Sequence, residues 1–394
     1  MKVLHVIPSL SAVHGGPTAA LALMERELTA QGIDVHTTTT DDDGPGRHNG
    51  NPCGVALAEN GATRRYFRKQ LDFYKYSPAL AAWLNAHAGD YDLLHIHALF
   101  SHSTIAAARA AGRAKVPYVI RPLGTLSQYG ITQRRPWLKR ASLALLEGPA
   151  LRQAAAVHFT SDAEKLEAAQ WGLALRGVVI PLGIEAAAPA PAGLVRQRFG
   201  SLGDAPYLLY LSRLDPKKNI EGLLQAFSQV AARWPDLRLL IAGDGDAGYV
   251  LGLKAQSAAM GVADRVVWAG HVTGDIKASV LAEALAFVLP SHSENFGIAA
   301  AEALMAGLPC VLGQGVAIAQ DVVSAGAGLA VAPDAGSIAA ALRRLLADKS
   351  ARAAMGANAL NLARHKYSAR AMGEGLLGLY EGLVLPISHR NGVI

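Results

Sequence analysis

The chain has 394 residues, of which 51% are hydrophobic and 17% charged, and it carries a net charge of +6 with a pI of about 9.3. This composition excludes a disordered chain, and the length favours two domains over one. A basic surface attracts phosphates, acidic sugars and anionic lipids. Because the sequence has no Lys/Arg tract and no aromatic-basic RNA-reading motif, it does not predict binding to nucleic acid.

Cysteine usage and the first residues indicate the compartment. Cys53 and Cys310 lie far apart and form no C-x-x-C pair, which suits a reducing cytoplasm. The first apolar run ends at Pro8, too early for a signal peptide. No stretch reaches the ~18 apolar residues of a membrane span. The sequence therefore predicts a cytoplasmic protein.

In the first half of the chain, apolar runs of strand length alternate with helix-length segments. Continuous apolar strands separated by helices favour a parallel sheet covered on both faces. The predicted strands are Lys2–Ile7, Asp34–Thr38, Asp92–His97, Pro117–Arg121, Ala155–Thr160 and Val178–Pro181, and the helices between them include Thr18–Gln31, Ser103–Gly112 and Ala163–Trp171.

A Pro/Ala stretch from Glu185 to Gly193 is the best linker candidate, and the alternation then restarts. The second half has predicted strands at Tyr207–Ser212, Leu237–Ala242, Val266–Ala269, Phe287–Pro290, Cys310–Gly313 and Leu329–Val331. Its predicted helices are Ile220–Arg233, Tyr249–Met260, Asp275–Glu283, Ile298–Ala306, Ser337–Leu346 and one long closing segment, Ala351–Leu383.

This pattern predicts an α/β protein with two Rossmann-like, doubly wound domains, residues 1–185 and 194–367, joined by a linker at 186–193. Ligands of such sheets bind beyond the carboxyl ends of the strands. We therefore expect the two domains to face each other across a cleft that holds the active site.

Polar and glycine residues follow the first-half strands. His14, Gly15 and Gly16 precede a helix with Pro17 at its start, an arrangement that can approach a phosphate or serve as an ordinary tight turn. Asp41-Asp42-Asp43 could hold a divalent ion. However, the surrounding Thr, Asp and Gly residues predict a solvated loop there.

His95 and His97 end a predicted strand and project to the same face. No carboxylate cluster accompanies them, which argues against a metal site. His97 lies nearest the strand end and is the candidate for a hydrogen bond to a sugar or the acceptor, whereas His95 suits a structural role. Arg121, at the end of the next strand, is a second acceptor-side candidate.

Two basic, aromatic stretches could rest on an anionic membrane, Arg134 to Arg140 around Trp137, and Tyr66-Phe67-Arg68-Lys69. For either stretch taken alone, a solvated charged face is the favoured interpretation. Together the two stretches keep a lipid-linked acceptor among the possible substrates.

In the second half, Arg213 and Lys218 follow a strand and open a helix. Cations near the positive end of a helix dipole are poorly placed unless an anion joins them, and two fixed cations can stabilise a departing diphosphate. A solvated helix start is the alternative. Gly243, in the turn Ala-Gly-Asp-Gly after the next strand, could approach a nucleotide.

The most informative segment runs from Ser291 to Pro309. It places Glu294 in a loop, starts a helix near Gly297 and puts Glu302 in the first turns of that helix. A glycine permits close backbone approach, and a helix start binds anions. Carboxylates accept hydrogen bonds from paired hydroxyls, so this unit could hold a sugar, a diphosphate and a ribose together. An acidic first turn that merely favours the helix dipole is the alternative.

These motifs, Ser-Arg213-Leu-x-Pro-Lys-Lys218-Asn, Ala-Gly243-Asp-Gly and Glu294-x7-Glu302 around Asn295-Phe296-Gly297, resemble the family 4 retaining glycosyltransferases of GT-B fold. The resemblance covers nearly the whole chain and is strongest from about Tyr207 to Gly313. It implies that Arg213 and Lys218 hold the donor diphosphate, that Glu294 faces the transferred sugar, that Glu302 holds the ribose, and that the backbone at Phe296 and Gly297 contacts phosphate.

The resemblance further implies that the loop with Gly15 and Gly16 reaches the donor phosphate and the acceptor, and that a closing helix at about 368–385 crosses back to the first domain. The family often reads Pro-His-Gly where this chain has Pro-Leu123-Gly. The role of that histidine near the reacting sugar therefore cannot be transferred to Leu123, and Arg121 or His97 could substitute.

The sequence thus predicts a retaining glycosyltransferase that needs no metal or other cofactor. It would move a hexose from a UDP- or GDP-sugar to a hydroxyl of a carbohydrate or lipid-linked acceptor, in polysaccharide, lipopolysaccharide or glycolipid synthesis, in the cytoplasm or at the inner face of the cytoplasmic membrane. The alternatives are a metal-dependent transferase using Asp41 to Asp43, a nucleotide-sugar epimerase and a non-catalytic nucleotide-sugar-binding protein. A Rossmann dehydrogenase is disfavoured because no G-x-G-x-x-G follows the first strand.

Overall fold

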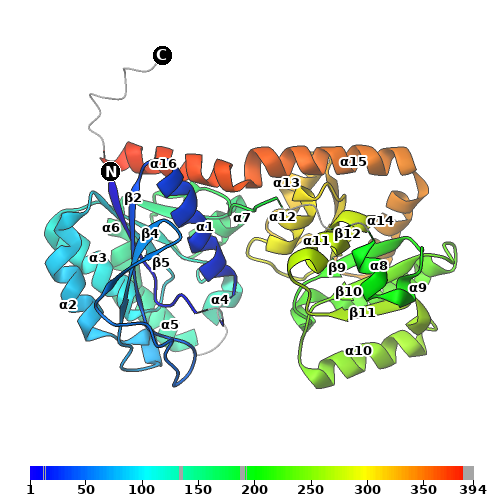
Figure 1. Cartoon of the computed structure of the whole chain (residues 1–394), viewed down its shortest axis with the longest axis horizontal. Helices are drawn as coiled ribbons and strands as arrows, with labels where there is room; N and C mark the ends of the chain where they lie inside the picture. The colour runs from blue at the N-terminus through cyan, green and yellow to red at the C-terminus, as the bar shows by residue number, and fades with distance from the viewer. Residues whose placement is uncertain (12, 14, 133–135, 187–190, 192, 385–394) are drawn as a thin grey trace, which may run out of the picture. The chain divides into compact units, whose positions relative to one another are not determined.

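The computed structural model describes the chain except residues 12, 14, 133–135, 187–190, 192 and 385–394. It divides into two compact units (Figure 1). The N-terminal unit contains Met1–Gly183 and the last helix, α16 (Ala369–Val384), and the C-terminal unit contains Ile184–Ser368. The linker predicted at 186–193 lies largely outside the described residues.

The N-terminal unit is built on an eight-stranded sheet of order β3-β4-β2-β1-β5-β6-β7-β8. Every neighbouring pair is parallel except β3 with β4. From β1 the chain builds one half of the sheet, and from β5 it builds the other, so the switch point lies between these two strands. The bounds are β1 (Lys2–Val6), β2 (Asp34–Thr40), β3 (Ala56–Glu59), β4 (Ala62–Phe67), β5 (Leu93–His97), β6 (Tyr118–Arg121), β7 (Ala156–Phe159) and β8 (Gly177–Val179).

Helices and short helical turns connect these strands, and serine side chains cap three of the helices. Ser77, Ser101 and Ser161 accept hydrogen bonds from amides in the first turns of α2, α3 and α7, which explains where those helices begin. The elements are α1 (Gly16–Ala30), η2 (Phe73–Lys75), α2 (Pro78–His87), η3 (Ala88–Asp90), α3 (His102–Ala114), α4 (Gln128–Thr132), α5 (Pro136–Ser142), the π-helical η4 (Leu143–Glu147), α6 (Gly148–Gln153) and α7 (Asp162–Ala169).

Strands β3 and β4 were absent from the sequence-based prediction, and β4 corrects two interpretations. Tyr66 and Phe67 end β4 and are buried, and Lys69 beyond them is also buried, so the membrane contact suggested for this stretch is wrong. The physical reason is the pairing of β4 with β2. That pairing carries Lys69 to the Asp42 carboxylate, 2.6 Å from its ammonium.

The same pairing overturns the solvated loop expected at Asp41 to Asp43 for the first two of these residues, whereas Asp43 is partly exposed. Asp41 and Asp42 are 2% and 0% exposed. Arg68 lies 3.2 Å from Asp41, and Lys69 and Lys75 both bind Asp42 at 2.6 Å. Cations of the protein therefore already bind Asp41 and Asp42, two of the three carboxylates that the metal-dependent alternative would use.

The C-terminal unit has a wholly parallel six-stranded sheet of order β11-β10-β9-β12-β13-β14. This is the doubly wound order 3-2-1-4-5-6, and its switch point lies between β9 and β12. The strands are β9 (Tyr207–Leu211), β10 (Arg238–Ala242), β11 (Val266–Gly270), β12 (Ala286–Leu289), β13 (Cys310–Gly313) and β14 (Gly328–Val331). Strands β9 and β12 are buried throughout because helices cover both faces.

The helices of the C-terminal unit follow the predicted alternation, with two short helices, α8 and α13, that the sequence analysis did not anticipate. They are α8 (Leu194–Arg198), α9 (Ile220–Ala231), α10 (Ala247–Ala259), α11 (Gly274–Glu283), α12 (Ile298–Met305), α13 (Ala319–Ser324), α14 (Ala335–Ala347) and α15 (Lys349–Leu362). Two parallel-sheet α/β units of Rossmann type confirm the predicted fold class.

The closing segment Ala351–Leu383, expected as one helix, is two. After α15 the chain makes a π-helical turn, Ala363–Tyr367, and Ser368 is extended (φ −71°, ψ 153°). The Ile184 amide donates to the Tyr367 carbonyl at 2.7 Å, which fixes the break where the chain leaves the C-terminal unit. Helix α16 then packs against α1 of the N-terminal unit (Figure 1).

Candidate functional site

Two loops lie side by side at the switch point of the C-terminal sheet. One follows β9 and carries Arg213 and Lys218, and the other follows β12 and carries Glu294. The Asn219 side-chain amide donates to the Pro290 carbonyl at 3.1 Å, and the His292 amide donates to the Lys217 carbonyl at 2.9 Å. These bonds join the loops at the carboxyl edge, where doubly wound sheets bind ligands.

Across this junction Lys218 forms an ion pair with Glu294. The two side chains are only 10% and 17% exposed, and Ser291 lies 3.4 Å from the same carboxylate oxygen. The Glu294 backbone is held on both sides, because its amide donates to Gly315 and its carbonyl accepts from Ala317. A cation and a carboxylate are thus presented together, which suits a ligand that has both phosphate oxygens and hydroxyls.

Helix α12 begins beside this pair. Gly297 precedes it with φ 95°, and no side chain of a described residue caps the helix. A Cβ atom on Gly297 would lie 3.0 Å from Val316, so both the backbone angle and the packing favour glycine. The Phe296 ring is 4% exposed and packs edge-on against Tyr367, so its side chain belongs to the core. Asn295 is exposed at the turn of the loop.

Glu302, in the first turns of α12, accepts a hydrogen bond of 2.6 Å from Lys277 of α11. Both side chains are partly exposed. The sequence analysis did not identify Lys277, because nothing in its own segment signals that α11 lies against α12. The ion pair orients the Glu302 carboxylate at the end of the sheet that carries Lys218.

Arg213 follows β9, and Gly243 follows the neighbouring strand β10. Arg213 is exposed, and no described residue forms an ion pair with its guanidinium. Gly243 has φ 140°, and a Cβ atom there would lie 1.9 Å from the Ser212 carbonyl oxygen. Its amide already donates to Gly270 at 2.7 Å, so packing alone requires this glycine. The predicted approach of Gly243 to a nucleotide stays a prediction.

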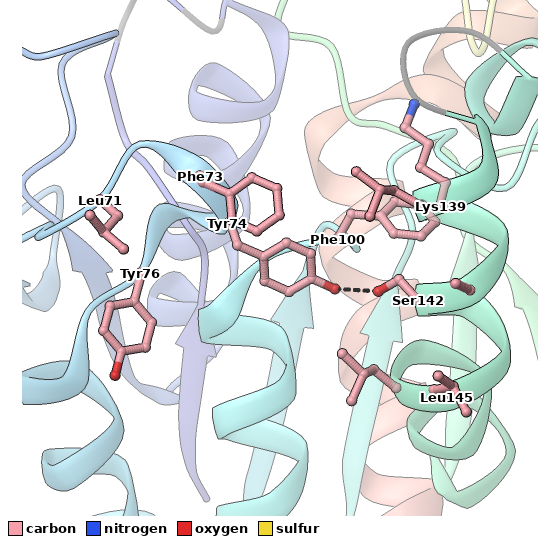
Figure 2. Close-up of a pocket in the computed structure, with 11 residues that line it drawn as sticks. Leu71, Phe73, Tyr74, Tyr76, Phe100, Lys139, Ser142 and Leu145 are labelled. Carbon is pink, nitrogen blue, oxygen red and sulfur yellow. Dashed lines mark hydrogen bonds between the residues drawn. The ribbon is translucent and has the colours of Figure 1, made fainter.

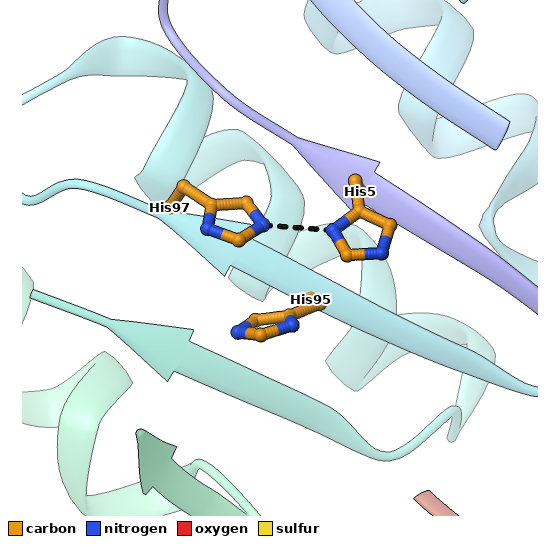
Figure 3. Close-up of side chains that lie close together, drawn as sticks. All are labelled: His5, His95 and His97. Atoms are coloured by element: carbon orange, nitrogen blue, oxygen red, sulfur yellow. Dashed lines mark hydrogen bonds between the residues drawn. The ribbon is translucent and has the colours of Figure 1, made fainter. Parts of the chain in front are cut away.

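In the N-terminal unit, His95 and His97 do share a face, and His5 joins them (Figure 3). The ring of His158 also lies beside that of His95. His5 Nδ1 lies 2.8 Å from His97 Nε2, and His95 Nδ1 lies 2.6 Å from the hydroxyl of Tyr380 in α16. All four rings are fully buried. Burial lowers the pKa of His5 and of His158 to about 3, and it holds the pKa of His95 and of His97 well below the usual range.

His5, His95 and His97 each offer a nitrogen, and these lie within 4.8 Å of one another. The geometry nevertheless favours a hydrogen-bonded network over a metal centre. Nitrogens bound tetrahedrally to one Zn²⁺ lie about 3.3 Å apart, whereas His5 Nδ1 and His97 Nε2 approach to 2.8 Å and share a proton. The buried Arg121 guanidinium also lies close enough to lower these pKa values, and it would repel an added cation.

His5 and His158 escaped the sequence analysis, although each is a polar residue within an apolar strand. The pairing of β1 with β5 sets His5 directly beside His95. His97 is fully buried in this arrangement, and its Nδ1 atom has no partner among the described residues. Its contact with a sugar or an acceptor stays a prediction.

The other N-terminal candidates have different surroundings. Arg121 is 2% exposed, and burial lowers its pKa to about 10. Gly15 has φ 67° and precedes α1, which begins at Gly16. His14 lies outside the described residues. Leu123 has a left-handed backbone (φ 57°), next to a Gly124 amide that donates to the buried Glu164 at 2.7 Å.

Comparisons with known proteins agree with this arrangement. Residues 15–183 match the model of the glycosyl transferase 4-like domain, and residues 194–362 match that of the glycosyl transferases group 1. The chain therefore belongs to the GT4-type glycosyltransferases, and the family expected from the sequence is confirmed.

Individual relatives extend the comparison. One relative is a GDP-mannose-dependent phosphatidylinositol monomannoside mannosyltransferase of Mycolicibacterium smegmatis. It is 31% identical to this chain over an alignment of 202 residues, and that alignment covers 49% of this chain and 52% of the relative. The chain is 28% identical to the D-inositol 3-phosphate glycosyltransferase of Acidothermus cellulolyticus, over 93% of this chain and 85% of the relative. In the first of these alignments the chain spans about half of the relative's length.

Among solved structures, Anabaena HepE in complex with UDP superimposes with a TM-score of 0.77 at 22% identity, covering 97% of this chain and 100% of that one. This similarity confirms the GT-B fold class. Among the described residues, no helix combines the length and the apolar character needed to cross a bilayer.

Proposed function

We propose that this protein is a retaining, metal-independent glycosyltransferase that moves a hexose from a UDP- or GDP-sugar to a hydroxyl acceptor. One observation carries the proposal. The partly buried Lys218–Glu294 pair lies beside the uncapped start of α12, at the switch point of a sheet of order 3-2-1-4-5-6. A cation, a carboxylate and free helix amides at one strand edge match a sugar diphosphate group by group.

In the proposed reaction the bond between the anomeric carbon and the diphosphate oxygen breaks. Arg213 and Lys218 stabilise the negative charge that develops on the departing diphosphate. The acceptor hydroxyl attacks the anomeric carbon from the same face, and its proton passes to a leaving phosphate oxygen. Retention of configuration rests on the family resemblance.

We assign the other residues by the same resemblance. Glu294 orients the transferred sugar without attacking it, and Glu302, held by Lys277, binds the ribose. Backbone groups of the loop and turns contact the donor phosphates, and polar side chains of the N-terminal part of the chain serve the acceptor side. The first set comprises Gly15, Gly16, Gly243, Asn295, Phe296 and Gly297, and the second His14, His97 and Arg121.

The relatives bear on the donor and the acceptor. HepE was solved with UDP, and the mannosyltransferase is named for GDP-mannose and for a phosphatidylinositol mannoside. These names support a UDP- or GDP-hexose donor and a carbohydrate or lipid-linked acceptor. We place the reaction in polysaccharide, lipopolysaccharide or glycolipid synthesis, in the cytoplasm or at the inner face of its membrane.

The first experiment is a thermal-shift panel of UDP-, GDP- and ADP-sugars, because a ligand that binds only the folded state raises its stability by mass action. The sugar that shifts the transition is then used as donor. Glu294→Ala should lower turnover at least ~100-fold at an unchanged melting temperature. Asp236→Ala, an exposed carboxylate in the turn before β10, is the matched control.

Unchanged turnover in Glu294→Ala would remove that residue from the mechanism. Activity lost in a metal chelator would favour the metal-dependent alternative. Epimerised sugar formed from the donor alone would replace the transferase by an epimerase, and donor binding without turnover on any acceptor would indicate a non-catalytic binding protein.

A further inference from the structure

An apolar cavity of about 640 Å³ lies in the N-terminal unit, outside the residues assigned above (Figure 2). Its walls come from the η2 segment, from the chain after β5, and from α5 with η4. The main apolar contributors are Leu71, Phe73, Tyr76, Phe100, Leu138 and Leu145. This volume lies within the range of about 300–1,000 Å³ found for sites that bind small molecules.

Most of the polar atoms in the wall already have partners within the protein, and Lys139 Nζ, for example, donates to the Gly130 carbonyl. The Tyr74 hydroxyl lies 2.7 Å from Ser142 Oγ, as Figure 2 shows, and both hydroxyls bind the buried carboxylate of Glu147. The Phe100 amide donates to the same carboxylate at 3.1 Å. A sugar or a phosphate in this cavity would lose hydrogen bonds to water and gain few in return. The walls therefore favour an apolar occupant.

The backbone around the cavity is strained. Tyr74, Lys75 and Phe100 have φ values of 60°, 48° and 56°, a left-handed conformation that residues other than glycine rarely adopt. Such strain persists only where the surroundings hold it, and it gathers at ligand sites. Glu147 supplies the restraint here, because it binds the Tyr74 hydroxyl and the Phe100 amide together.

The mouth of the cavity is apolar and exposed. Phe73 is 59% exposed and Leu145 75% exposed. Trp137 of α5, which precedes the wall residue Leu138 in the sequence, is 70% exposed. The same helix carries Lys139 and Arg140. Apolar side chains beside cations suit an amphiphile with an anionic headgroup, whose chain enters the cavity while the headgroup stays at α5.

The position of the cavity relates it to the sheet. Phe100 stands three residues beyond the end of β5, and β5 borders the switch point of the N-terminal sheet. Ligands of doubly wound sheets gather at this edge. The cavity thus lies in the unit that we assign to the acceptor.

We propose that this cavity binds the hydrocarbon chain of the acceptor, which makes the acceptor an amphiphile with an acyl or isoprenoid chain and an anionic headgroup. The proposal rests on the transferase function above and narrows its acceptor class. The basic, Trp-bearing stretch of the sequence does not predict this cavity by itself, because Leu71, Phe73 and Tyr76 of its wall come from a distant segment.

The test measures binding of alkyl phosphates from butyl to dodecyl by calorimetry, below their micelle concentrations. Each methylene group buried in the cavity should lower Kd roughly 4-fold, so dodecyl phosphate should bind at least ~100-fold more tightly than butyl phosphate. Leu145→Asp and Ala141→Asp place charge at exposed positions of the wall, where the fold tolerates it. Each should weaken dodecyl phosphate at least ~10-fold.

Leu166→Asp, at a position 70% exposed on α7 and away from the cavity, is the matched control and should change nothing. Thermal shifts with the donor sugar are measured on every variant. Normal donor binding with no dependence of Kd on chain length would overturn the lipid proposal and leave the transferase intact. Loss of the donor shift in the unsubstituted protein would instead contradict the proposed function.

Binding to vesicles that contain anionic lipid completes the test. Vesicle binding that depends on Trp137, without any binding of dodecyl phosphate, would show a membrane-contact surface in place of a chain-binding site and would also overturn the proposal.

Discussion

The buried histidines of the N-terminal unit should make that unit sensitive to acid. His5 and His158 have pKa values of about 3 in the folded chain, against an ordinary value of 6.5. Between these values the unfolded chain binds a proton at each histidine and the folded chain does not. Stability is therefore complete above pH 6.5 and falls as the pH decreases towards 3.

The magnitude follows from these two pKa values. At pH 5 an unfolded histidine is almost fully protonated, while the folded one remains neutral whether its pKa is 3 or 4. Each of the two therefore removes about 2 kcal/mol from the free energy of unfolding relative to pH 8, and together they remove about 4 kcal/mol. His95 and His97 are shifted in the same direction and add to the loss. Against a domain stability of about 5–15 kcal/mol, this loss should make opening of the N-terminal unit markedly more frequent at pH 5 than at pH 8.

Hydrogen exchange followed by mass spectrometry can resolve the two units. Amides of β1, β5 and β7 should lose protection between pH 7.5 and 5, after correction for the intrinsic exchange rate. Those of β9 and β12 should retain it, because the described histidines of the C-terminal unit, His271, His292 and His365, are all exposed.

His158→Gln keeps a hydrogen-bonding group but cannot gain the proton. The loss of unfolding free energy between pH 8 and pH 5 should therefore be smaller in this variant by about 2 kcal/mol, the contribution of one histidine. Equal loss of protection in both units, or a pH dependence unchanged by His158→Gln, would refute the reasoning.

Two further substitutions test the packing. Arg64 binds Glu25 through two nitrogens, and both side chains are at least 92% buried. Arg64→Ala should therefore lower the free energy of unfolding by about 3–5 kcal/mol in urea titrations. Adding Glu25→Gln to this variant should restore part of the lost free energy of unfolding, because it removes the unpaired buried charge. A loss below 1 kcal/mol would mean that the pair is not buried in solution. Gly297→Ala meets both a φ of 95° and Val316 at 3.0 Å; it should cost about 1–3 kcal/mol and weaken donor binding in the thermal-shift assay, whereas Gly252→Ala, in an open position on α10, should do neither.

The glycosyltransferase motifs were readable in the sequence because each lies within one short segment. The stretch from Glu294 to Glu302 includes a loop, a helix start and both carboxylates, so its chemistry follows from local rules. The same holds for Arg213 and Lys218, which stand directly after one strand. What these segments could not show was the Lys218–Glu294 ion pair, because it joins residues that are 76 positions apart.

Other features depend on strand order. Asp41 to Asp43 looked solvated because their own neighbours are Thr, Asp and Gly. Only the pairing of β2 with β4 brings Lys69 to Asp41 and Asp42, and those two carboxylates are buried. His5 beside His95 likewise requires β1 to pair with β5 across a gap of about ninety residues.

By itself, then, the sequence determined the alternation of strands and helices, the Rossmann-type fold of each half and the family. Apolar periodicity and turn residues act within a few positions, and any chain with this pattern buries the same faces. The tertiary structure alone decided which buried charges neutralise one another, where the closing helix breaks, and that Leu71, Phe100 and Leu145 enclose one apolar cavity. Contacts between distant segments depend on how strands pair and where loops return, and no local pattern of residues encodes that.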